Sequence, residues 1–555
     1  MVSQSSDDTP TGPINRSAAQ VQQTPRARII RPQADGDPTR RWNTASDITA
    51  VVLVIVALFL PWNLYFGLGI PDSNTALFAV LLAVTLLSVI AVAVAGSWRS
   101  AGARFNPATA GRVRLVLNVP YLLLVLAFVG FDAFETVRFG GSVNVPGGVG
   151  PGAWVGVAGA LLSAQTAVTG ARTGPVPEGD ELTGKYRSAR IIGYASMLAA
   201  VLSFGFNLYW RLRYALQNSA GAAAFGKQNI AVIATAVVYG VVALIAVLVA
   251  SRWLSRNTRA SRLATVALGA STLVAGILVW TLPAGRDIDA FHGIAQNTST
   301  AGVGFEGYLA WAAAAAIFAP RALFGHRNTS AAEETAWRVA ARNGLALIAV
   351  WCVGSIVMRI TDLAVSFSLN YPFSRYDSMV LAAFDLVTAL LVIWLRASLA
   401  DATRSARLIS SLCGLVAALT VARVIVGVVL APRFADSPNS PALQPVYGNN
   451  LAQQITSTFD VTLCGLALCI FAAAVVTGHL AGRRVRRQAR RAARKADTGP
   501  PRPRVPVGQA VPPSAAATTR IPTAPSGAPR IFRGDDSATR QIPLQRPKIF
   551  RPPQQ

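Results

Sequence analysis

The sequence is poor in charged residues, and this scarcity indicates the class of protein to which it belongs. Charged residues make up 14% of the 555 positions, hydrophobic residues make up 52%, and the mean hydropathy is +0.43. A soluble globular domain usually carries about 25% charged residues, so the composition argues against one. The chain is predicted to be an all-α integral membrane protein that crosses the bilayer several times.

Cysteine and histidine are equally scarce. The four cysteines contain no CxxC pair, and the three histidines lie far apart without ligand spacing. The sequence therefore predicts no disulfide framework, no metal site and no cofactor. It also lacks a Walker loop, an HExxH motif and a GxSxG motif. An ATP-driven pump, a zinc protease and an α/β-hydrolase are disfavoured, and the chain is more readily interpreted as a non-enzyme.

Lysine and the acidic residues are also few. Lysine occurs only at 185, 227, 495 and 548, so arginine carries most of the net charge of +26. This bias, together with abundant alanine, suggests a bacterium with a GC-rich genome. Residues 481–555 alone hold 17 basic and 3 acidic side chains.

Long apolar segments are abundant. A bilayer core about 30 Å thick needs roughly 20 apolar residues per helix. Twelve segments meet this requirement, of which the eighth is short and rich in alanine. They lie near 47–67, 75–95, 115–137, 152–171, 190–210, 230–250, 262–282, 303–320, 342–363, 379–396, 407–430 and 456–480. Residues 1–46 contain no apolar run and are predicted to be a disordered tail, not a cleavable signal peptide.

The distribution of basic residues predicts the orientation. With the N-terminus inside, the connections on the inner side carry 19 basic residues and those on the outer side carry seven. Cytoplasmic loops are enriched in arginine and lysine. We therefore expect both termini in the cytoplasm, in a bacterial plasma membrane.

Internal similarities recur at offsets of four segments. The sequence Gly148-Val-Gly-Pro-Gly-Ala-Trp154 opens the fourth segment, and Gly302-Val-Gly-Phe-Glu-Gly-Tyr308 opens the eighth. Because four is even, such units would have the same orientation. The 47–480 membrane domain is thus predicted to contain three parallel four-helix repeats, 47–172, 190–325 and 342–482. Chance similarity among alanine-, valine- and leucine-rich helices is the alternative.

Several charged residues lie inside the predicted spans. Counting from Arg342 at the inner border, Arg359 is 17 residues, or roughly 25 Å, along its helix. The others also fall toward the outer side. The candidate polar site comprises Asp132, Glu135, Arg359, Asp362, Asp385, Arg423 and Asp460. Such groups either form ion pairs that lock helices together or face an aqueous cavity as a substrate or proton site. A closed network would favour the first interpretation and an open cavity the second.

The predicted cytoplasmic tail begins with a basic juxtamembrane segment, 481–497. Its arginines are expected to contact the anionic headgroups of the bilayer, while nucleic-acid binding is not expected. These are Arg483, Arg484, Arg486, Arg487, Arg490 and Arg491. Residues 498–555 are rich in proline and predicted to be disordered. Two related pentamers containing Phe532 and Phe550 are candidate docking motifs for cytoplasmic protein partners, although chance repetition is a competitor.

Two functional hypotheses follow. The first is transporter-like handling of a small or amphiphilic solute through an outward-facing polar cavity. The second is a membrane scaffold for cell-envelope assembly or division that recruits partners through its tails. An enzyme acting on lipid-linked substrates ranks third, because the first external connection, about Leu68 to Asn74, is short and contains one acid, Asp72.

Overall fold

In the residues that the computed structural model describes, the secondary-structure elements are all α-helices. The described residues are 38–62, 75–100, 107–139, 149–165, 180–219, 226–256, 258–281, 304–324, 330–369, 375–401, 403–435 and 458–497. The helices are α1 (Pro38–Phe59), α2 (Thr75–Ser100), α3 (Pro107–Phe139), α4 (Pro151–Ser163), α5 (Asp180–Ser219), α6 (Lys227–Ser255), α7 (Arg259–Thr281), α9 (Phe305–Phe324), α10 (Ser330–Leu369), α11 (Arg375–Ser398), α12 (Ala406–Ala435) and α14 (Thr458–Asp497).

Ten helices in the described part of the chain are long and apolar enough to cross a bilayer. Their outward faces carry large apolar side chains such as Leu126, Leu202 and Leu390, each more than half exposed. This is the surface that a lipid environment favours. The chain is therefore a multi-pass membrane protein. The fourth and eighth predicted segments correspond to shorter apolar helices, Pro151–Ser163 and Phe305–Ala319.

Helix α1 ends earlier than the predicted first segment, which extended to residue 67. The helix stops at Phe59, just before Pro61, because proline lacks an amide hydrogen and disfavours helical geometry in the residue before it. Backbone amides at the start of α4 then bind the carbonyls that follow α1. Gly150 N donates to Trp62 O at 2.7 Å, and Gly152 N donates to Pro61 O at 2.9 Å.

Both glycines are required by this close approach. A Cβ at Gly150 would lie 2.4 Å from Pro61 O, and one at Gly152 would lie 2.4 Å from the Trp62 ring. Distances this short cannot be accommodated without moving backbone. The Gly-rich sequence before α4 is therefore a packing requirement.

Polar side chains join helices α1 to α4. Asn118 Nδ2 in α3 donates to Ser163 Oγ in α4 at 3.1 Å, and Ser163 Oγ donates to Ser88 O in α2 at 3.0 Å. Arg114 and Asp47 form an ion pair at 2.5 Å between α3 and α1. All three contacts join residues far apart in the sequence, so they fix the helices against one another.

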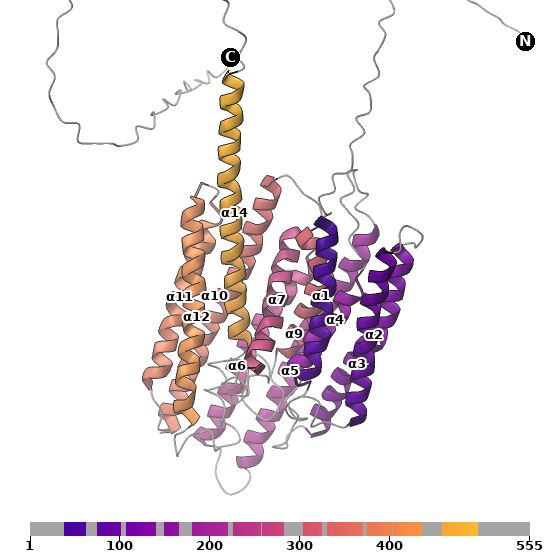
Figure 1. Ribbon diagram of the computed structural model, residues 1–555. Helices are drawn as coiled ribbons and strands as arrows, with labels where there is room; N and C mark the ends of the chain where they lie inside the picture. Colours follow the sequence, from indigo (N-terminus) through magenta and orange to yellow (C-terminus); the bar gives the residue numbers. More distant parts are fainter. Residues whose placement is uncertain are drawn as a thin grey trace, which may run out of the picture. The chain divides into compact units, whose positions relative to one another are not determined.

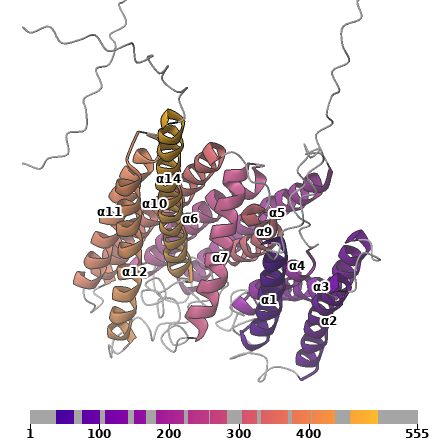
Figure 2. The same cartoon turned by 45° about the horizontal axis from the view of Figure 1, so that its top comes forward.

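The two short helices lie among the longer ones. Figures 1 and 2 show α1–α4 grouped at one side, α10–α12 and the bundle portion of α14 at the other, and α6, α7 and α9 between them. In α9, Ala312–Ala316 are all buried, and small residues let neighbouring helices approach closely. Aromatic side chains mark this centre: Trp154 of α4 contacts Tyr308 of α9 with ring centroids 5.0 Å apart.

The chain divides into two compact units, 1–487 and 488–555. Of the second unit, only 488–497 are described, as the end of α14. Residues 1–37 and 498–555 lie outside the described residues, so the predicted tails and the motifs at Phe532 and Phe550 do as well. Residues 38–46, predicted as part of the N-terminal tail, instead form the beginning of α1.

Candidate functional site: a buried arginine–carboxylate cluster

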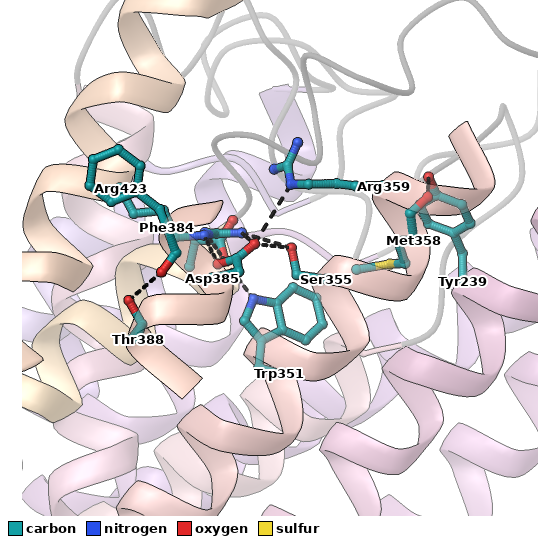
Figure 3. Close-up of polar contacts among 10 residues, drawn as sticks. Tyr239, Trp351, Ser355, Met358, Arg359, Phe384, Asp385, Thr388 and Arg423 are labelled. Atoms are coloured by element: carbon teal, nitrogen blue, oxygen red, sulfur yellow. Dashed lines mark hydrogen bonds and ion pairs between the residues drawn. The ribbon is translucent and has the colours of Figure 1, made fainter. Parts of the chain in front are cut away.

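Four of the predicted site residues come together from four helices. Arg359 of α10, Asp385 of α11, Arg423 of α12 and Asp460 of α14 form what we call the arginine cluster (Figure 3 shows all but Asp460 labelled). Each of the four is at most 6% exposed. Charges this deeply buried are stable only when paired and hydrogen-bonded.

Arg423 is the centre of the cluster. Its guanidinium forms an ion pair with Asp385 through Nε, and its Nη1 lies 2.6 Å from Asp460 Oδ1. Its Nη2 donates to Ser355 Oγ at 3.0 Å, and Ser355 Oγ in turn donates to Asp385 Oδ2 at 2.7 Å. One arginine therefore ties α10, α11 and α14 to α12.

Asp460 has a second fixed partner. It lies in the first turn of α14, where a carboxylate interacts favourably with the helix dipole. Trp351 Nε1 donates to Asp460 Oδ1 at 2.5 Å. The Trp351 ring also packs edge-on against Phe459, with centroids 4.7 Å apart. Packing and a hydrogen bond together hold this acid in the cluster.

Arg359 is bound much more loosely. Its Nε lies 3.6 Å from Asp385 Oδ2, which is within ion-pair range but beyond a normal hydrogen bond. Neither Nε nor Nη1 of Arg359 has a hydrogen-bond partner among the described residues, although the side chain is only 2% exposed. Figure 3 shows Nε on the side of Asp385 and the two terminal nitrogens of the guanidinium directed away from it.

Asp362 lies one turn beyond Arg359 and takes a different partner. The hydroxyl of Tyr239 in α6 donates to Asp362 Oδ1 and also to Met358 O, the latter at 3.1 Å. Both side chains are buried. Asp362 therefore joins α10 to α6, alongside the arginine cluster.

Asp132 lies in a different part of the bundle. It is buried in α3 and interacts electrostatically with Glu306 of α9. Glu306 accepts a hydrogen bond from Ser203 of α5 and another from Gly304 N at 2.9 Å. We call Glu306 with these donors the Glu306 site. The side chain of Glu135, the other acid predicted on this helix, lies outside the described residues.

The family of the chain follows from residues 43–479, which match the model of a domain of unknown function, DUF7937. The chain belongs to the DUF7937 family. The match begins within α1 and ends within α14, so the family domain contains both polar regions. No curated protein and no solved structure matches the chain.

Sequence reasoning missed the uncharged members of these sites in the DUF7937 domain. Trp351, Ser355 and Arg359 are spaced four residues apart, which places them on one helix face. That spacing was the available signal for Trp351 and Ser355. Tyr239 and Ser203 had no such signal, because their partners lie on other helices more than 100 residues away.

The remaining predicted residues are placed only in part. The arginines from 483 to 491 lie within α14, which continues without a break from Thr458 to Asp497 (Figure 1), but their side chains lie outside the described residues. The described residues contain no group of three or more histidine, cysteine, aspartate or glutamate side chains that could hold a metal ion.

Proposed function

We propose that this DUF7937 protein handles a small or amphiphilic solute in a transporter-like manner, using the arginine cluster as its polar site. The supporting observation is the burial of two arginines and two aspartates contributed by four different helices. Ionisable residues inside a membrane bundle commonly mark substrate or ion pathways. Movement of any one of these helices would change the contacts of the cluster, as transport requires.

The unequal pairing of the two arginines also supports this proposal. A network that served only to lock helices is expected to hold each charged group close to a counter-charge, since an unpaired buried charge is costly. Arg423 pairs closely with Asp385 through Nε, with Asp460 through Nη1 and with Ser355 through Nη2, whereas Arg359 lies 3.6 Å from Asp385 and its Nη1 has no hydrogen-bond partner in the described part of the chain. A group that must exchange partners during transport is expected to be held in this looser way.

Chemical accessibility tests the proposal. Ser355→Cys would be introduced into a chain whose four native cysteines are replaced by alanine, and the protein would be reconstituted in liposomes. A charged, water-soluble thiol reagent added to either side should modify the new thiol, because a transporter must expose its site to water in some state. Leu345→Cys, at a fully buried apolar position of the same helix, is the matched control and should stay unreactive.

Equal lack of reaction at both positions, from either side, would contradict transport through this cluster. The charged residues would then be structural ion pairs. Folding of each variant would be checked by size-exclusion chromatography before labelling.

The proposed setting is a bacterial plasma membrane, with twelve spans and both termini in the cytoplasm. The proposal counts α4 and α9 as short spans and retains three parallel four-helix units. Two aromatic contacts between helices favour this arrangement, because Trp154 of the fourth segment contacts Tyr308 of the eighth, and Trp311 of the eighth contacts Phe459 of the twelfth. Reporter fusions placed after residues 143, 295 and 445 should all report the outer side.

A scaffold for cell-envelope assembly or division is the second candidate. It is favoured by the continuation of α14 as a helix through Asp497, well past the apolar stretch that ends at Gly478. Basic residues there would contact anionic headgroups, and the following tail would recruit cytoplasmic proteins. Deletion of residues 499–555 should abolish a scaffold function but leave a transporter largely active.

A further inference from the structure

The two arginines of the cluster differ in how fully their hydrogen-bond donors are used. Arg423 directs its guanidinium at Asp385, Asp460 and Ser355. Arg359 lies 3.6 Å from Asp385, and its Nε and Nη1 have no hydrogen-bond partner in the described part of the chain. A guanidinium carries five donors in a rigid planar fork, so much of the binding capacity of Arg359 is unused.

The neighbouring acids are already engaged. Asp385 is held by Arg423 and by the Ser355 hydroxyl, and Asp460 by Arg423 and Trp351. Asp362 accepts the hydroxyl of Tyr239. Figure 3 shows Arg359 Nε on the side of Asp385 and the two terminal nitrogens of its guanidinium directed away from that carboxylate.

This arrangement is costly unless it serves recognition. A buried charged donor that makes no hydrogen bond loses its hydration and recovers only part of that cost from a distant counter-charge, and such groups in folded proteins need a specific explanation. The surrounding contacts hold Arg359 in place without saturating it. An entering oxyanion could take Arg359 from Asp385, while Arg423 and Ser355 continue to neutralise that aspartate.

We infer that Arg359 binds an oxyanion, so that the solute of this protein carries a carboxylate or phosphate group. The planar fork of arginine matches both groups through two parallel N–H···O bonds. The inference rests on the proposed function, because it names the chemical class of the solute at the same cluster. The oxyanion could belong to a free solute or to a lipid headgroup.

Binding of simple oxyanions tests the inference. The full-length protein in a neutral detergent would be titrated with sodium phosphate and with sodium acetate, with sodium chloride added to keep the ionic strength constant. Its unfolding temperature should rise and saturate with at least one oxyanion, since a ligand that binds only the folded state stabilises it. A wild-type protein that responds to no oxyanion, free or in lipid, would overturn the inference.

Variants of one residue locate the effect. Arg359→Gln should weaken oxyanion binding at least about tenfold, and Arg359→Lys, which keeps the charge but loses the fork, should weaken it by less. The control is Arg404→Gln, because Arg404 is half exposed and pairs with Asp401 at the surface. It should bind as the wild type does. Equal binding by Arg359→Gln and the wild type would refute the inference, and Arg359→Lys provides the comparison if the glutamine variant fails to fold.

An experiment in lipid distinguishes a free solute from a lipid headgroup as the source of the oxyanion. The same proteins would be placed in nanodiscs of phosphatidylcholine with or without phosphatidylglycerol. Stabilisation by phosphatidylglycerol alone, lost in Arg359→Gln, would support oxyanion binding but contradict transport of a soluble solute. Uptake of a cationic or neutral solute that persists in Arg359→Gln would support transport but overturn the inference. The two proposals can therefore fail separately.

Discussion

Two regions of this membrane protein contain buried carboxyl groups, and the two regions hold these groups with different kinds of partner. The arginine cluster joins α10, α11, α12 and α14 through charged partners, with Arg423 shared between Asp385 and Asp460. The Glu306 site holds its carboxylate with the hydroxyl of Ser203 and the backbone N–H of Gly304. Paired charges couple several helices at once, whereas hydroxyl and amide donors solvate one acid locally.

The difference between the regions predicts how each responds to mutation. Removing one member of an ion-pair network leaves the others charged and buried, so the penalty spreads across several helices. Removing Glu306 leaves two neutral donors without a partner and takes away the carboxyl group that interacts with Asp132, so no paired charge is left behind. Stability measurements on detergent-solubilised protein can therefore rank the two kinds of site.

The largest loss is expected for Arg423→Met. This change keeps most of the side-chain volume but leaves Asp385 and Asp460 without their shared counter-charge, which should lower the free energy of unfolding by about 3–5 kcal/mol. Denaturant unfolding followed by tryptophan fluorescence measures it, with Arg404→Gln as the surface control. A loss no greater than that of the control would mean that Arg423 does not hold the helices together.

A smaller loss is expected for Glu306→Ala. The substitution leaves the hydroxyl of Ser203 and the amide of Gly304 without an acceptor, which should lower the free energy of unfolding by about 1–3 kcal/mol. Glu306→Gln keeps an acceptor oxygen and should lose less. If Glu306→Ala proved as costly as Arg423→Met in the same unfolding assay, the contrast between charged and neutral partners would be wrong.

Tyr239→Phe tests a hydrogen bond from a neutral donor to a buried acid, at Asp362 beside the arginine cluster. The change removes only the hydroxyl that serves Asp362 and Met358 O, so we expect a loss of about 1 kcal/mol. Thermal unfolding of the variant would be compared with that of Tyr194→Phe, whose side chain is more than half exposed. Equal unfolding temperatures of the two variants would contradict a stabilising role of the Tyr239 hydroxyl.

The smallest effect should arise at the surface turn between α11 and α12. The pKa of Asp401 lies below its ordinary value because the hydroxyl and backbone N–H of Thr403 donate to its carboxylate, with Arg404 adding to the effect. The stabilisation is therefore present above the ordinary aspartate pKa, about 3.9, and is lost as the pH falls through the lowered value.

Asp401→Asn should thus be slightly less stable than the wild type near neutral pH and equal to it in acid. Melting temperatures from pH 7 down to pH 3 would measure the difference, and Asp47→Asn would serve as a comparison at a paired acid. A difference that did not shrink in acid would contradict the assignment to Asp401.

Much of the fold could be predicted because it depends on composition and local pattern. Apolar stretches of about 20 residues predicted the multi-pass architecture, and each of the twelve predicted segments overlaps a described helix. The predicted end of α1 was wrong because apolar residues continue past Pro61, and hydropathy does not register a helix-breaking residue. The end of α4 at Ser163 was also missed, because Ala164 and Gln165 are both compatible with a helix and give no stop signal.

Only the charged residues of the candidate site could be predicted from the sequence. Arg359, Asp385, Arg423 and Asp460 stood out because charges in apolar helices are rare, and their opposite signs indicated pairing. Asp132 stood out equally, yet it lies with Glu306 and away from the cluster. A one-dimensional sequence gives the depth of each residue along its helix but not the direction in which that helix face points.

The sequence by itself determined the membrane location, the approximate helices and the identity of the buried charges. These follow from the free energy of transferring side chains and backbone into an apolar medium, which depends on the residues themselves. Only the tertiary structure decided that Arg423 is shared between two aspartates while Arg359 keeps unused donors. Partner choice depends on how helices distant in sequence pack, and distances of a few tenths of an ångström separate a hydrogen bond from a loose ion pair.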